Sequence, residues 1–216
     1  MRVPKVVGLM TGLLFAGIVL NPAYAEEPAV PEPQALVEAV TEKVLQALKE
    51  YKAKEDPAFL DEKIQELIVS QMDFEAMAKL VLGKHWRTAT PEQRGRFVEE
   101  FKSLLIRTYR TSLTEYSEEK VTFLPFREGE QPEKLATVKS EIIRSNGPTI
   151  PINYSLRYKK EDGWKVYDIG IEGVSLVTNY RSSFAREINQ NGMDKLIESL
   201  RQRNAGKATE DEKAQG

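Results

Sequence analysis

The stretch that decides the fold is residues 150–171, IPINYSLRYKKEDGWKVYDIGI. From Ile150 to Tyr158, apolar side chains alternate with polar ones, which is the period of a β-strand with one buried face. The turn-forming sequence EDG at 161–163 separates this segment from a second apolar one. The stretch therefore predicts two consecutive antiparallel strands.

The second of these strands is unusual because it is apolar on both faces. Strict alternation places its side chains as follows: Trp164 and Val166 on one face, and Tyr167, Ile169 and Ile171 on the other. Helices or another chain covering the second face would explain this pattern, and so would a β-bulge near Gly170. The sequence leaves these alternatives open.

Two more strand candidates lie upstream, after Glu118, and are bounded by Gly129 and by the Asn-Gly pair at 146–147. Four strands in series predict an antiparallel meander. Helical spacing precedes them, in segments that start near Ala35, at Asp56 and at Asp73, and the third segment ends at Gly83.

The strongest helix signal is the sequence TPEQ at 90–93, a capping box with proline at the first helical position. It predicts a long helix to about Tyr116, and two shorter helices follow the strands, near 176–188 and 193–202. Helices, then strands, then helices predict an α+β fold, in which helices pack on an antiparallel four-stranded sheet.

The N-terminus has the features of a secretory signal: a basic start, an apolar run at 6–20 and the small-residue sequence Ala23-Tyr24-Ala25. We expect cleavage after Ala25 and release into the periplasm. Within the remaining 191 residues, we expect a proline-rich linker at 26–34, a single domain at 35–203 and a disordered polar tail at 204–216.

Composition excludes several classes of function. The mature chain has 29 basic residues against 33 acidic ones, a net charge near −4 with both signs interspersed, which does not fit a nucleic-acid-binding protein. The chain has no cysteine, so disulfides and thiolate metal sites are excluded.

Residues for catalysis are scarce. The single histidine, His85, has no predicted catalytic partner, and we expect no catalytic residue, cofactor or metal site. Asp168 is the one rival, because its apolar neighbours Trp164 and Ile169 could raise a carboxyl pKa towards the range of a general base. A loop-capping or ion-paired role is the alternative for this aspartate.

Two segments resemble a known family: residues 81–94, VLGKHWRTATPEQR, and residues 163–176, GWKVYDIGIEGVSL. Both are similar to the MlaC, or toluene-tolerance, family of periplasmic phospholipid-binding proteins. The resemblance covers nearly all of the mature chain. It implies a cone of helices over a curved sheet, like that of nuclear transport factors but with extra helices, enclosing an apolar cavity.

The resemblance also implies a role as a non-enzymatic shuttle that keeps phospholipid out of the outer leaflet of the outer membrane. Its partners would be phospholipid, an outer-membrane lipoprotein–porin complex and an inner-membrane ABC transporter. Apolar periodicity nominates lining residues, with plain core packing as the alternative for each: Phe97, Phe101, Leu104, Leu105, Tyr109, Tyr154, Leu156, Trp164, Val166, Tyr167, Val174, Leu176, Val177 and Tyr180.

Two other classes of function compete with a carrier. A small isomerase or hydrolase in the same type of cone would need Asp168 to point into the pocket. A chaperone-like module for exported proteins would need an exposed apolar groove instead of an enclosed cavity.

Overall fold

The computed structural model describes residues 32–115, 118–126 and 133–206. The predicted signal peptide, residues 26–31 of the predicted linker and residues 207–216 of the predicted tail lie outside the described residues. The elements are α1 (Glu32–Lys54), α2 (Pro57–Lys63), the π-helix η1 (Ile64–Ile68), the 3-10 helix η2 (Val69–Gln71), α3 (Phe74–Leu82), α4 (Lys84–Thr88), α5 (Pro91–Glu115), β1 (Lys120–Leu124), β2 (Leu135–Ile143), β3 (Ile150–Lys159), β4 (Gly163–Ile171), β5 (Val174–Ser175), α6 (Leu176–Asn191) and α7 (Met193–Asn204).

The strands form one antiparallel sheet in the order β1-β2-β3-β4-β5, which confirms the α+β class and the meander. The sheet has five strands in place of the predicted four. The extra strand, β5, has only two residues and pairs with the end of β4 after a tight turn at Glu172 and Gly173. A strand this short carries no detectable alternation in the sequence.

A β-bulge explains why β4 has apolar side chains at both odd and even positions. The pairs on either side of the bulge are Ser155 with Asp168 and Leu156 with Val166. Tyr167 is thus the extra residue, and beyond it the alternation reverses. Ile169 and Ile171 therefore share the inner face of Val166, and the sequence prediction that they face the other side was wrong. The bulge lies at Tyr167, three residues before the predicted Gly170.

The helix starts agree with the sequence because their caps are local. Asp56 and Asp73 each accept a hydrogen bond from a backbone N–H of the helix that they precede, at 2.9 and 3.0 Å. Thr90 and Gln93 form the predicted capping box, in which each side chain accepts a hydrogen bond from the other residue's backbone N–H.

Two boundaries differ from the expectation. Helix α1 begins at Glu32, so residues 32–34 belong to a helix and not to the linker. Pro33 is tolerated in the first turn because a backbone N–H at that position would have no intrahelical partner. At the other end, Asn204 is still helical, and its side-chain amide donates hydrogen bonds to the carbonyl and carboxylate oxygens of Glu100.

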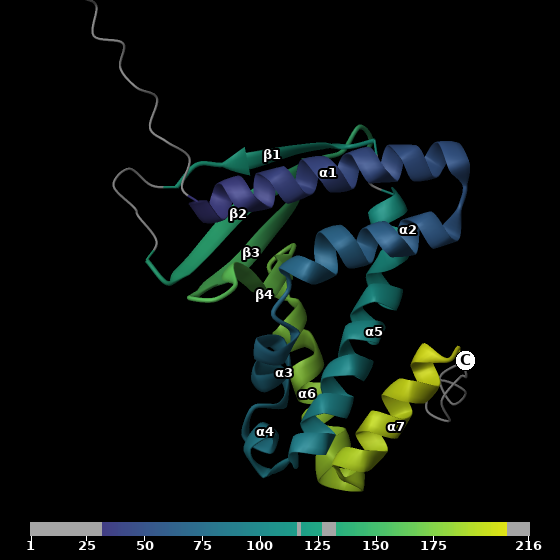
Figure 1. Cartoon of the computed structure of the whole chain (residues 1–216), viewed down its shortest axis with the longest axis vertical. Coiled ribbons are helices and arrows are strands. Elements are labelled where there is room, and N and C mark those ends of the chain that lie inside the picture. The colour runs from purple at the N-terminus through teal and green to yellow at the C-terminus, as the bar shows by residue number, and fades with distance from the viewer. Residues whose placement is uncertain (1–31, 116–117, 127–132, 207–216) are drawn as a thin grey trace, which may run out of the picture.

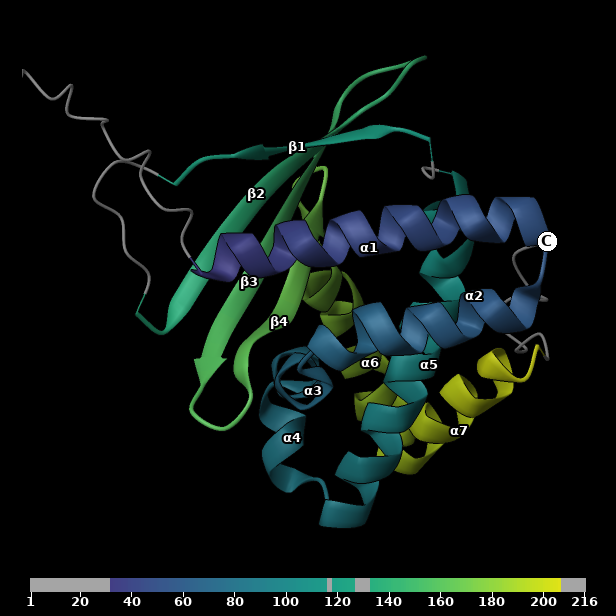
Figure 2. The same cartoon turned by 45° about the horizontal axis from the view of Figure 1, so that its top comes forward.

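Helix α1 crosses strands β2 to β4, and the continuous segment α2-η1 runs alongside it, beside the sheet, so that these helices form one layer (Figures 1 and 2). Helices α3, α4, α6 and α7 lie at the other end of the molecule, around the first half of α5 (Figure 1). The long helix α5 connects the two regions.

The second region is a solid helical core, defined by buried side chains of α3, α5, α6 and α7. At its centre, the rings of Phe97 and Phe101 stack with centroids 5.6 Å apart. Phe184 packs edge-on against both, at 5.8 and 6.0 Å. All three side chains are almost completely buried, which indicates that this part of the domain is filled.

Candidate functional site

An apolar cavity of about 410 Å³ lies between the α1-α2-η1 layer and the sheet. This volume falls within the range of small-molecule pockets. Its wall combines one face of α1, the η1-η2 segment, the second half of α5 and the inner face of the sheet. Most of this wall is formed by residues that the sequence did not nominate: Leu36, Val37, Val40, Val44, Leu45, Leu48, Ile64, Ile68, Val69, Met72, Phe74, Ile106, Leu113, Val121, Ile142, Ile150, Ile152, Ile169 and Ile171.

Local sequence patterns build the two main walls. In α1, Leu36, Val40 and Val44 are spaced four residues apart, so they lie on one helical face towards the cavity. On the sheet, the bulge aligns Ile169 and Ile171 of β4 with the inner side chains of β3. Both faces of the cavity are therefore aliphatic.

Five of the fourteen residues nominated from the sequence lie on the cavity wall: Leu105, Tyr109, Tyr154, Val166 and Leu176. The structure places the other nine elsewhere. Phe97, Phe101, Leu104, Val177 and Tyr180 belong to the helical core or pack against it. Leu156 and Trp164 pack with Val138 in a buried cluster that adjoins the cavity wall through Val37 and Val166.

The last two nominated residues are Tyr167, which is the bulge residue, and Val174, which is 56% exposed in β5. Spacing did not separate these nine residues from the other five because a core and a cavity wall use the same side chains at the same spacing. The stripe of α1 was visible in the sequence, but nothing in its spacing showed that it would face an empty space.

Few polar groups reach the cavity. Burial raises the pKa of the Tyr154 hydroxyl, and the neighbouring hydroxyls of Ser140 and Thr41 offset part of that rise. Burial also raises the pKa of Tyr109, and the nearby Tyr180 adds to this effect. Both tyrosines are therefore neutral at physiological pH, which suits an uncharged ligand surface.

Asp168 does not line the cavity. Its carboxylate accepts hydrogen bonds from the hydroxyl of Ser175 at 2.6 Å and from the backbone N–H of Val177 at 3.2 Å, at the start of α6. It lies on the sheet face opposite to Ile169, since neighbouring residues alternate. These contacts support the start of α6, whose N-cap is Ser175, whereas the alternatives left open by the sequence were a loop-capping or an ion-paired role.

No metal centre is found either. Within residues 32–115, 118–126 and 133–206, no group of three or more histidine, aspartate or glutamate side chains could hold a metal ion. His85 lies in the short helix α4, away from the residues that line the cavity.

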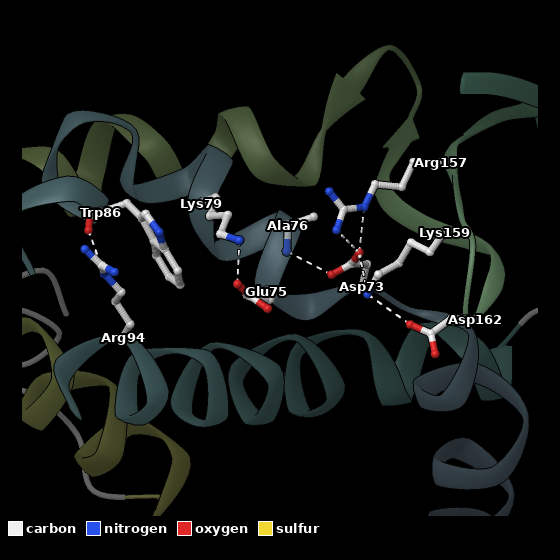
Figure 3. A network of polar contacts seen from close by, with 9 residues as sticks. All are labelled: Asp73, Glu75, Ala76, Lys79, Trp86, Arg94, Arg157, Lys159 and Asp162. Atoms are coloured by element: carbon white, nitrogen blue, oxygen red, sulfur yellow. Dashed lines mark hydrogen bonds and ion pairs between the residues drawn. The ribbon is translucent and has the colours of Figure 1, made fainter. Parts of the chain in front are cut away.

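An ion pair of a buried carboxylate with two partly exposed basic side chains fixes one end of the helical layer to the sheet (Figure 3). The Asp73 side chain is 3% exposed, and its carboxylate accepts hydrogen bonds from Arg157 at 2.5–2.7 Å and lies 3.4 Å from the ammonium of Lys159. The Asp73 backbone N–H donates to the carbonyl oxygen of Val166 at 2.8 Å. We call this group the Asp73 clamp; it holds the chain between η2 and α3 against the edge of β4.

Replacement of Asp73 by asparagine should lower the free energy of unfolding at pH 7 by about 1.5–3 kcal/mol, because the cap is retained but the charged hydrogen bonds are lost. Burial alone would raise the pKa of Asp73, but the N–H of Ala76 and the charges of Arg157 and Lys159 outweigh burial and lower that pKa. The stabilisation is then complete above about pH 4 and is lost as the pH falls further.

Urea unfolding of wild type and D73N at pH 7 and near pH 3 measures this effect, and the difference between the two proteins should shrink at the lower pH. D162N, which removes an exposed partner of Lys159, is the matched control and should cost at most about 1 kcal/mol. Equal losses for D73N and D162N would contradict the clamp.

The sequence segment 81–94 has a structural role. The side chain of Arg94 donates hydrogen bonds to the carbonyl oxygens of Trp86 and Arg87, at 2.9 and 3.2 Å, and its guanidinium lies 5.3 Å from the Trp86 ring centroid (Figure 3). Gly83 ends α3 with φ 53°, a conformation that favours glycine. These contacts fix the angle between α3, α4 and α5.

Among the helices of the described part of the chain, none has the length and apolar composition that a membrane span requires.

Comparison with known proteins assigns the family. The family model described as MlaC protein matches residues 38–202, well over half of the chain. The chain belongs to the MlaC family. Two curated relatives agree with this assignment. One is the intermembrane phospholipid transport system binding protein MlaC of Haemophilus influenzae, 27% identical over 200 residues, with 90% of each chain covered. The other is the toluene tolerance protein ttg2D of Pseudomonas putida, 29% identical over 175 residues, covering 79% of this chain and 80% of that one.

A solved structure also matches: the phospholipid-binding protein of Ralstonia solanacearum in complex with a phospholipid. It is 32% identical, with a TM-score of 0.73, and the match covers 81% of this chain and 97% of that one. The fold of this MlaC family member is therefore shared with a protein that was solved with lipid bound.

Proposed function

We propose that this protein is a periplasmic carrier that binds phospholipid non-covalently, with the acyl chains in the cavity beneath α1. The observation that carries the proposal is the aliphatic cavity of about 410 Å³ in a chain that shares its fold with a phospholipid-bound protein. The predicted signal sequence at residues 1–25 supports the periplasmic location.

The energetics of lipid transfer require such a cavity. Each methylene that moves from an apolar environment into water costs about 0.8 kcal/mol, so a phospholipid with roughly thirty methylenes leaves a membrane at a cost on the order of 20 kcal/mol. A dry protein cavity offsets this cost in proportion to the chain length that it covers. No covalent chemistry is needed, in agreement with the position of Asp168, which lies outside the cavity wall and accepts hydrogen bonds from Ser175 and Val177.

We further propose that the carrier exchanges phospholipid between an outer-membrane lipoprotein–porin complex and an inner-membrane ABC transporter complex. The name of the Haemophilus influenzae relative, a binding protein of an intermembrane phospholipid transport system, supports this role. A soluble shuttle must release its cargo, and we expect docking to each complex to provide the release.

A transfer assay tests the carrier function. Donor vesicles that contain a fluorescent phospholipid are mixed with unlabelled acceptor vesicles, with and without the mature protein. We expect transfer to rise in proportion to protein concentration and the protein to be recovered with labelled lipid. Transfer that does not depend on the protein, from preparations whose fold is intact by circular dichroism, would contradict the proposal.

A further inference from the structure

One residue of the cavity wall differs from all others in the described structure. Among the described residues that line the cavity, Glu172 is the only one with an acidic or basic side chain. It is exposed to solvent, whereas the flanking wall residues Ile171 and Leu176 are half-buried and buried. Glu172 therefore marks a mouth of the cavity, where the aliphatic wall meets water.

The backbone holds this carboxylate at the mouth. Glu172 and Gly173 form the two-residue turn between β4 and β5, with φ of 51° and 83°. Such turns favour asparagine, aspartate or glycine at both positions, so the local conformation does not account for a glutamate. The backbone N–H of Glu172 also donates to the carbonyl oxygen of Pro151 at 3.0 Å, which ties the turn to β3.

Within residues 32–115, 118–126 and 133–206, the Glu172 carboxylate forms neither an ion pair nor a hydrogen bond. Two other acidic side chains near the sheet have partners: Asp73 pairs with Arg157, and Asp168 accepts hydrogen bonds from Ser175 and Val177. Glu172 thus presents free acceptor oxygens at the point where a lipid with buried acyl chains would place its headgroup.

We propose that Glu172 selects phospholipids whose headgroup ends in a primary ammonium, an inference that rests on the proposed carrier function. A carboxylate accepts charge-assisted hydrogen bonds from an ammonium, which has three N–H donors. It repels a headgroup with only negative charge. Zwitterionic aminophospholipids are therefore bound in preference to anionic phospholipids with the same acyl chains.

The size of the preference follows from exposure. An ion pair in contact with solvent contributes up to about 1 kcal/mol, which corresponds to roughly a fivefold change in affinity. We therefore expect Glu172 to shift the ratio of bound lipids about two- to fivefold, while the acyl chains supply most of the affinity.

The test is a competition between two headgroups. Delipidated mature protein is incubated with vesicles of equimolar phosphatidylethanolamine and phosphatidylglycerol that have identical acyl chains, re-isolated and extracted, and the two lipids are quantified by mass spectrometry. Wild type should be enriched in phosphatidylethanolamine, and E172Q should lose about two- to fivefold of that enrichment with total lipid per protein unchanged.

Three variants make the result specific. E172D keeps the carboxylate and suits the turn, so it should retain the preference, whereas E172K should favour phosphatidylglycerol. E161Q removes an exposed charge from the turn between β3 and β4 and should behave like wild type. If E172Q carries lipid in the wild-type ratio, the headgroup proposal is wrong while the carrier function stands. If wild type binds no lipid, both proposals are wrong.

Discussion

Val40→Trp is expected to lower the amount of phospholipid carried per protein at least tenfold. Val40 lies on the cavity face of α1, and an indole at this position occupies space that the acyl chains need. Loss of only two methylenes from the cavity costs about 1.6 kcal/mol, which already exceeds a factor of ten in affinity. Lipid loading from vesicles, quantified by mass spectrometry, measures the effect.

The matched control is Ala39→Trp, one residue earlier on α1 and exposed. A39W adds more side-chain volume than V40W does, but on the solvent-exposed face of α1, so it should leave lipid loading unchanged. V40W should unfold at or above the wild-type temperature, because it fills empty space. Normal loading in V40W, with its fold retained, would show that lipid does not bind beneath α1.

The second large effect is on stability. Phe101→Ala should lower the free energy of unfolding by about 3–5 kcal/mol, because it opens a void in a closely packed aromatic cluster. The protein that remains folded should still load with lipid, since Phe101 belongs to the helical core and does not line the cavity. Urea unfolding and lipid loading on the same sample measure both quantities.

Phe101→Leu is the conservative control and should cost clearly less, because it keeps most of the buried volume. The contrary result would be a loss of loading in F101A with little loss of stability. That outcome would restore the interpretation of the sequence, in which Phe101 contacts the ligand.

Helix α5 shows how far sequence periodicity could predict the site. Its apolar stripe continues without a break from Phe97 to Leu113. The first part, with Phe97 and Phe101, packs into the helical core, and the second part, from Leu105 onward, faces the cavity. Spacing assigns a face of the helix, but the partner of that face depends on elements far away in the chain.

Strand β4 shows the same limit in another form. The apolar residues were correctly assigned to a strand, but their face depended on one extra residue, Tyr167. A bulge changes the alternation without changing the composition, so the sequence allowed several explanations. The hydrogen bonds that the Asp168 carboxylate accepts from Ser175 and Val177 join β4 to the start of α6, and the alternation pattern alone does not contain them.

Local interactions were predicted well for the same reason. The capping box of Thr90 and Gln93 and the cap by Asp73 involve residues only three positions apart, so their geometry is contained in the sequence. The ion pair between Asp73 and Arg157 joins residues 84 positions apart and had no local signal.

The central claim is that the cavity beneath α1 holds phospholipid, and organic extraction of the purified mature protein tests it most directly. The extract is analysed by mass spectrometry at known protein concentration. The account predicts diacyl phospholipid at about one molecule per protein. An extract without phospholipid, from folded protein that also takes up none from vesicles, would contradict it.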